Sequence, residues 1–337
     1  MPSLTELSRL EGPRSQDMMG WLLQFSPFIA RLEERSAFEL GATDFDLYPV
    51  DGDASVQTRG VGGDYTQNAE TPPSRQTEDL GFHGDAVTID RSHVVDDERG
   101  LRPIEAWVNN RLRMKGRFWA RGMTKLFFQG AGTTGPREMK GLKNILDGSN
   151  VPGFNISMVI DAVDFLDTDP NSLDLSKDAH VEAFRRGMEQ IVPQFEDFGD
   201  PLIVANSQLG ATLGTIARKN QSYDRIEGAF GGMIERIFGG DLQRVSSNAI
   251  TNTEPDNAGT PNNVTTSLYI MVPMPGMYSA VTNGGLEVED ELDEILEEKR
   301  SGEIAWELRV ENAIQDRYAI RRIRNIELPA GAGDYIV

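Results

Sequence analysis

The 337-residue chain has no cysteine and only three histidines. Without cysteine it has no disulfide framework, no thiolate zinc site and no cysteine nucleophile. His83, His93 and His180 lie far apart in the sequence, which argues against a histidine-rich metal site. We therefore expect the protein to bind no metal and to need no other cofactor.

Long hydrophobic runs are also missing. No apolar stretch approaches the roughly 18–20 residues that span a bilayer. The first residues, Met1 to Arg14, lack the apolar stretch of a signal peptide. We therefore expect a soluble, intracellular protein that makes no membrane contact.

Basic residues are outnumbered by acidic ones. The 33 Lys and Arg residues stand against 53 Asp and Glu residues, so the formal net charge is −20. Such a charge favours solubility and argues against a general affinity for nucleic acid or anionic membranes. Because single cores stop growing at roughly 250–300 residues, this length and a hydrophobic content of 39% predict more than one packed unit.

Charges of each sign gather in two segments. The stretch from Arg99 to Lys125 holds eight basic residues and one acid, Glu105, within a helix predicted over residues 99–129. The stretch from Glu287 to Glu298 holds eight acids among twelve residues. The basic stretch is either a solvated face balanced within the same fold or a surface for an electrostatic partner. That partner is an acidic segment of a neighbouring copy or a nucleic acid.

Two segments match motifs of ligand-binding sites in part. Gly130–Gly135 matches G-x-G-x-x-G, but a dinucleotide site needs a strand before the glycines, and a helix is expected there. Asp167, Asp169, Asn171 and Asp178 occupy positions of a calcium loop that lacks its glycine and its final glutamate, so a solvated acidic loop explains them better. No catalytic constellation emerges, and we expect a protein that is not an enzyme. A nucleotide-dependent α/β enzyme built on Gly130–Gly135 is the alternative from another class.

The order of segments along the chain is more informative than any motif. Two strand-like stretches flank a tract rich in Gly, Asp, Thr and Pro, which predicts a projecting flap or an ordinary surface loop. Further helices are expected at Asp178–Ile191 and Ser207–Arg218, and strands at Pro201–Ala205, Thr266–Val272, Tyr278–Val281 and Ile304–Val310. The predicted units are an apolar N-terminal arm (1–35), an extended loop (36–98), the helix and its surroundings (99–150 with 286–326), an α/β unit (151–285) and a tail (327–337).

Three local phrases fit this order. Gly135–Leu142 pairs a proline with a later Gly-Leu, Leu202–Ser207 is a strand followed by Asn-Ser and a helix, and Glu303–Ile326 is a long strand with an arginine-rich return. Together they resemble the major capsid proteins of tailed bacteriophages, which have the Hong Kong 97 fold. The resemblance covers roughly residues 15–326.

The resemblance implies an α+β capsid subunit with an extended β-hairpin loop, a spine helix with a β-sheet in a peripheral domain, and an α/β axial domain. Such a subunit forms pentamers and hexamers of an icosahedral head that encloses double-stranded DNA, and it is assembled in the host cytoplasm and resides in the virion. Its expected partners are copies of itself, a portal and decoration proteins, with only weak contacts to the packaged DNA. An encapsulin-type nanocompartment has the same fold and is the nearest rival.

Two departures from the family pattern carry expectations of their own. Some members join subunits through a lysine of the extended loop, but this chain has no lysine before Lys115, so we expect a non-covalent shell. Only about 35 residues precede the loop, so we expect a separate scaffolding protein rather than a fused one. By position in the loop and spine helix, we expect these inter-subunit contacts: Arg59, Tyr65, His83, Trp107, Arg113, Arg117 and Trp119.

Overall fold

The computed structural model describes most of the chain, and the account below concerns those residues alone. They are residues 3–49, 75–90, 102–132, 138–147, 157–168, 170–220, 222–227, 233–257, 265–291 and 301–329. No helix among them is long and apolar enough to cross a membrane.

Three short helices begin the chain: α1 (Leu4–Glu11), α2 (Pro13–Phe25) and α3 (Pro27–Glu34). A capping box between Ser3 and Glu6 starts α1, and a proline in the first turn starts each of the other two. Their apolar side chains, among them Met18, Leu22 and Phe28, are buried in the main core of the same chain. The apolar arm expected over residues 1–35 thus belongs to the core of its own subunit, where α2 packs on α5.

The first sheet is built around one long strand. This strand, β14, pairs with β4 and β13 along its first ten residues and with β12 near its end. All of these pairings are antiparallel, and β1 extends the sheet by a parallel pairing with β12. The strands are β1 (Phe38–Leu40), β4 (Gly81–Asp90), β12 (Tyr278–Thr282), β13 (Glu287–Asp290) and β14 (Ser301–Ile314).

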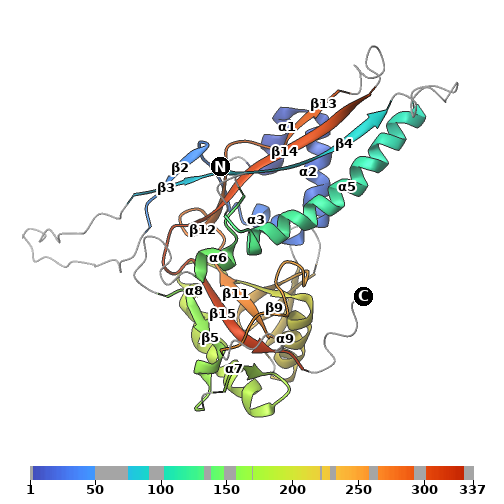
Figure 1. Ribbon diagram of the computed structural model, residues 1–337. Helices are drawn as coiled ribbons and strands as arrows, with labels where there is room; N and C mark the ends of the chain where they lie inside the picture. Colours follow the sequence, from blue (N-terminus) through green and yellow to red (C-terminus); the bar gives the residue numbers. More distant parts are fainter. Residues whose placement is uncertain are drawn as a thin grey trace, which may run out of the picture.

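The 28-residue helix α5 (Arg102–Gln129) lies alongside this sheet (Figure 1). Its buried side chains recur at helical spacing, at Val108, Leu112, Trp119 and Met123, and α5 contacts β4 and α2. The chain then turns back into the short helix α6 (Leu142–Leu146). The long helix expected over residues 99–129 is confirmed from residue 102 onward.

The second sheet lies below the first in Figure 1 and has helices beside it. Its central strand β7 reads Leu-Ile-Val-Ala-Asn and is completely buried, as expected of a strand covered on both faces. The strand order is β5 (Val159–Asp161), β15 (Ile320–Glu327), β11 (Thr265–Met271), β7 (Leu202–Asn206), β10 (Gly240–Val245), β9 (Met233–Ile237) and β8 (Tyr223–Glu227), with β6 (Leu173–Asp174) also pairing β15. The accompanying helices are η1 (Ala162–Phe165), α7 (Asp178–Ile191), α8 (Pro193–Glu196) and α9 (Ser207–Lys219).

The α+β class expected from the sequence is therefore observed, but the sheets divide the chain differently from the expected boundary at residues 285 and 286. Strand β12 was placed in the α/β unit, yet it pairs with β14 in the first sheet. Strand β15 was placed with the spine helix, yet it pairs with β11 in the second sheet. The chain thus passes from one sheet to the other three times, after β4, after β11 and after β14.

Candidate assembly surfaces

A two-stranded ribbon projects from the first sheet on the side opposite to the free end of α5 (Figure 1). It consists of β2 (Asp44–Leu47) paired antiparallel with β3 (Gln76–Asp79). Phe45 and Leu47 anchor its base in a small buried cluster with Leu80, Val281 and Ala313. The strands lead to residues 50–74, so the base of the expected flap is observed and the rest of it, with Arg59 and Tyr65, lies outside the described residues.

Polar contacts also hold the ribbon. Asp46 accepts hydrogen bonds from Arg75 Nε at 2.8 Å and from Thr77 Oγ1 at 2.9 Å, and these two bonds lower the pKa of Asp46. On the other strand, Glu78 pairs with Lys140, which precedes α6. The ribbon is thereby fixed to the subunit by its first pairs of residues.

A buried carboxyl group lies next to this attachment. Glu311 on β14 accepts hydrogen bonds through Oε1 from the backbone N–H groups of Lys140, at 2.9 Å, and Asn312, at 3.0 Å. Burial raises the pKa of Glu311 to about 8, against the lowering effect of these two bonds. The group therefore titrates near neutral pH beside the residue that holds the ribbon.

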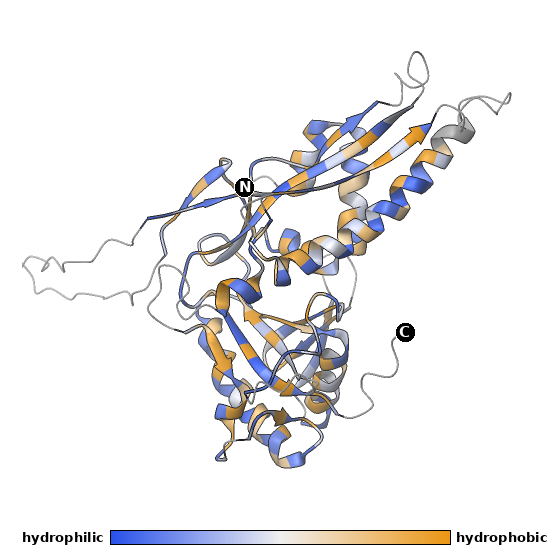
Figure 2. Cartoon of the chain, in the orientation of Figure 1, coloured by the Kyte–Doolittle hydropathy of each residue, from blue (hydrophilic) through white to orange (hydrophobic). Residues whose placement is uncertain are grey.

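The outer face of α5 is strongly basic. Arg113 is exposed, Arg117 lies over the Phe25 ring at 5.7 Å and Arg111 lies over the half-buried Trp107 ring at 5.2 Å. Three of the expected contact residues, Trp107, Arg113 and Arg117, are thus brought to one helix at or near the surface. Figure 2 shows hydrophilic and hydrophobic residues interspersed along α5.

Two other expected contact residues lie inside the subunit. His83 on β4 is 7% exposed, its Nε2 has no hydrogen-bond partner among the described residues, and burial lowers its pKa. Trp119 is 9% exposed and its ring meets that of Trp306 edge-on, 6.4 Å between centroids. Both residues are therefore buried within the subunit instead of lying on its surface, and Trp119 of α5 packs there on Trp306 of β14.

The arginine-rich return strand is likewise not a free basic patch. Arg321 and Arg322 are buried in the second sheet, and Arg324 pairs with Asp161 at 3.3 Å. Arg322 donates to Glu254 Oε2 at 2.8 Å. No local sequence pattern indicates these pairings, because the partners lie in segments far away along the chain.

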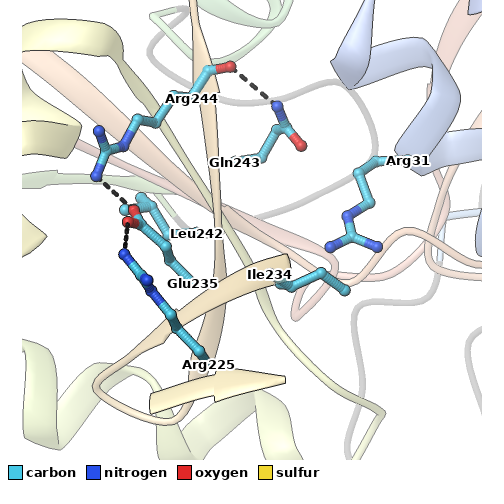
Figure 3. Close-up of a pocket in the computed structure, with 7 residues that line it drawn as sticks. All are labelled: Arg31, Arg225, Ile234, Glu235, Leu242, Gln243 and Arg244. Carbon is cyan, nitrogen blue, oxygen red and sulfur yellow. Dashed lines mark hydrogen bonds and ion pairs between the residues drawn. The ribbon is translucent and has the colours of Figure 1, made fainter. Parts of the chain in front are cut away.

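A second group of arginines meets at a surface hollow in the second sheet (Figure 3). Glu235 on β9 is shared by Arg244 on β10, Arg225 on β8, at 3.9 Å, and Arg218 on α9, at 3.6 Å. Arg31 lies across the hollow and pairs with Glu34. The Glu235 carboxylate on β9 therefore forms ion pairs with residues of β8, β10 and α9 at the edge of the sheet. No sequence motif indicated this group of ion pairs.

The two nominal motifs do not form ligand sites in the described part of the chain. Gly130 directly follows α5, so a helix stands where a dinucleotide site requires a strand. Asp178 is the first residue of α7 and its calcium-loop companion Asp169 lies outside the described residues. Among described residues there is also no group of three His, Asp or Glu side chains that would hold a metal ion.

Comparison with known proteins gives matches in structure alone. No protein-family model matches the sequence, and no curated protein sequence matches it. The holo-SrpI encapsulin complex from Synechococcus elongatus aligns over 89% of this chain and 87% of its own, with a TM-score of 0.48 and 12% identity. The capsid of the native GTA particle aligns over 88% and 90%, with a TM-score of 0.49 and 14% identity. The satellite phage P4 procapsid aligns over 93% and 99%, with a TM-score of 0.48 and 12% identity. The chain is thus similar to structures of the two kinds, capsid and encapsulin, that the sequence resemblance had indicated.

Proposed function

We propose that the chain is the major capsid protein of a tailed phage, a subunit that assembles into the pentamers and hexamers of an icosahedral head around double-stranded DNA. The observation that carries the proposal is the shape of the subunit. A long helix with two long paired strands projects to one side of a compact second sheet, and the β2–β3 ribbon projects to the other (Figure 1). Among its described residues the ribbon contributes only Phe45 and Leu47 to a buried cluster, and contacts with neighbouring copies would stabilise such a projecting element.

The proposed shell is non-covalent and built without catalysis. The first lysine of the chain is Lys115, on α5, so the β2–β3 ribbon and the residues it leads to supply no lysine for a covalent link. Assembly of the head in the host cytoplasm would use a separate scaffolding protein and a portal, with decoration proteins added outside. The net charge of −20 keeps contacts with the packaged DNA weak.

Negative-stain electron microscopy of the expressed protein tests the proposal. The protein is imaged alone and together with the products of the genes that neighbour its own. Shells tens of nanometres across, dissociated by SDS into single subunits, are the expected result. Discrete monomers or dimers under every condition contradict the proposal, and an SDS-resistant ladder contradicts the non-covalent shell. Particles that hold a protein cargo in place of DNA identify a nanocompartment.

A further inference from the structure

The surface hollow of Figure 3 holds more cations than its carboxylate neutralises. Glu235 pairs there with three arginines, which are Arg218, Arg225 and Arg244. A carboxylate offers about four acceptor sites, whereas three guanidinium groups carry about fifteen N–H donors. The side chains of Arg218 and Arg225 are also more than half exposed. In a chain of net charge −20, this hollow therefore keeps an excess of positive charge that a further carboxylate can bind.

The subunit holds the three arginines in place by itself. The centroid of the Tyr223 ring on β8 lies 4.6 Å from the guanidinium carbon of Arg218 and 5.7 Å from that of Arg225. Arg225 Nε also donates to the Tyr223 hydroxyl at 2.7 Å. Gly210 on α9 leaves room for Arg244, because a Cβ there would lie 2.9 Å from Arg244 Cγ. Side chains fixed in this way lose little further freedom when they bind a partner.

A second hollow, on the other side of the same sheet, is acidic. Asp147, Asp161 and Asp164 line it, and Arg324 is the cation among the described lining residues. Asp161 pairs with Arg324 at 3.3 Å. Asp164, in η1 directly after β5, is exposed and has no ion-pair partner among the residues that the structure describes. This hollow therefore presents a carboxylate that its own subunit does not neutralise.

The two hollows belong to opposite edges of the second sheet. Strand β5 is at one end of the strand order and β8 is at the other, six steps away. At about 4.8 Å per step, these two strands lie roughly 30 Å apart. Asp164 beside β5 therefore does not reach Arg225 on β8 of the same subunit. Copies placed side by side bring the β5 edge of one to the β8 edge of the next, and such a head-to-tail contact closes into a ring when the rotation fits.

We propose that the arginine hollow of each subunit binds the acidic hollow of the next copy in a ring, with Arg218 and Arg225 facing Asp164. The inference rests on the proposed function, because it assigns a contact within the pentamers and hexamers. Arginine binds carboxylates through paired, charge-assisted hydrogen bonds. A nucleic acid explains the observations less well, because it leaves the acidic hollow without a cation and the net charge repels a polyanion.

Cysteine cross-linking tests this contact without background, because the chain has no cysteine of its own. A chain that carries both Arg225→Cys and Asp164→Cys is assembled and treated with a short bis-maleimide. The expected product on an SDS gel is a ladder that ends at pentamers and hexamers. Lys125→Cys, at an exposed position of α5, replaces Arg225→Cys as the control and should give no such ladder. A ladder that ends at dimers, or particles without any ladder, overturns the contact.

Charge reversal supplies the second arm. Arg225→Glu and Asp164→Lys should each raise the protein concentration needed for assembly by about tenfold, and the two changes in one chain should restore it. Because the two positions are too far apart to meet within one subunit, this rescue measures a contact between copies. Lys125→Glu with Asp164→Lys is the matched control and should not restore assembly. Urea unfolding of each isolated variant separates a loss of folding from a loss of contact.

The outcomes distinguish the contact from the proposed function. If the wild type forms particles and the single variants assemble equally well, the contact is refuted while the proposed function stands. If Arg225→Glu assembles normally but retains less DNA, the arginine hollow binds nucleic acid instead. If the wild type forms no particles at all, the proposed function fails and the contact with it.

Discussion

Arg322 on β15 and Glu254 form an ion pair in the interior of the second sheet, with 2.8 Å between Nη2 and Oε2. Their side chains are 2% and 6% exposed. Ser267 on β11 joins them, because its hydroxyl donates to Glu254 Oε1 at 3.1 Å and lies 3.2 Å from Arg322 Nε. Asp147, just after α6, accepts from the other end of the guanidinium group. One arginine thus connects the return strand, the sheet centre and the segment that follows α5.

Replacing Arg322 with methionine should strongly destabilise the unassembled subunit. The change leaves Glu254 buried without its cation, and breaking a buried pair in this way costs about 3–5 kcal/mol. Urea denaturation of the isolated subunit gives the free energy of unfolding. Arg324→Met is the matched control on the same strand, because the exposed Arg324–Asp161 pair is worth about 0–1 kcal/mol. Equal losses in the two variants would contradict the importance of the buried pair.

Stability of the subunit should fall as the pH rises through neutrality because of Glu311. Burial raises its pKa to about 8 in the folded state, from the ordinary 4.5. Between these values the folded state holds more protons than the unfolded state, so the stabilising contribution is complete below about pH 4.5 and lost as the pH approaches 8. Glu311→Gln should reduce this change in the free energy of unfolding with pH, which amounts to a few kcal/mol at most over the whole range. Urea midpoints at pH 5, 6, 7 and 8 measure it, and Glu303→Gln, at an exposed position on the same strand, is the control. Equal slopes in wild type and Glu311→Gln would refute the assignment.

Asn206 at the end of β7 should be another sensitive position. Its Oδ1 accepts from Leu209 N at 2.8 Å and caps α9, while its Nδ2 donates to Thr266 Oγ1 at 2.8 Å and to the Ile250 carbonyl at 3.3 Å. Loss of a cap costs about 1 kcal/mol, and each buried group left unsatisfied adds about 1–3 kcal/mol. Asn206→Ala should therefore cost more than Ser3→Ala, which removes the exposed cap of α1. The thermal unfolding midpoints of the two variants show which substitution costs more stability.

The sequence predicted local elements well where one face is buried. Val181, Phe184, Met188 and Ile191 recur at helical spacing, and α7 has the expected bounds. The alternation around Trp306 likewise predicted a strand, and β14 contains it. Such periodicity indicates which face of a helix or strand is buried, but it does not indicate which other element covers that face. The apolar spacing of α2 for this reason did not indicate that α5 of the same subunit covers it.

Pairing between distant segments is what the sequence did not reveal. Strand β12 was expected as a strand but placed in the α/β unit, and the return that forms β15 was expected as the end of one long strand beside the spine helix, because a strand's pattern does not indicate its partner. Nothing in the local sequence indicated that Arg321 and Arg322 are buried, since burial of an arginine is expected only with a partner. That partner for Arg322, Glu254, lies 68 residues away in the sequence. The shared carboxylate of Glu235 was missed for the same reason.

Two glycines after α5, Gly130 and Gly141, lie where two backbone segments come close together. A Cβ at Gly130 would lie 2.1 Å from the Met139 carbonyl oxygen, and one at Gly141 would lie 2.3 Å from Gly130 N. The two backbones are joined there by a hydrogen bond of 2.9 Å from Gly141 N to Gly130 O, so neither side of the contact can yield without breaking the turn from α5 into α6. Both glycines therefore serve close backbone packing, and for Gly130 this is a structural use of a residue that the nominal phosphate-binding fingerprint would require.

Gly141→Ala should accordingly destabilise the subunit by several times the roughly 1 kcal/mol that separates glycine from alanine in a helix. Gly122→Ala, on the exposed side of α5 with open space around it, should stabilise the subunit by up to that amount. Urea unfolding of the two variants side by side measures the contrast. If Gly141→Ala unfolds at the same urea concentration as the wild type, the packing explanation is overturned.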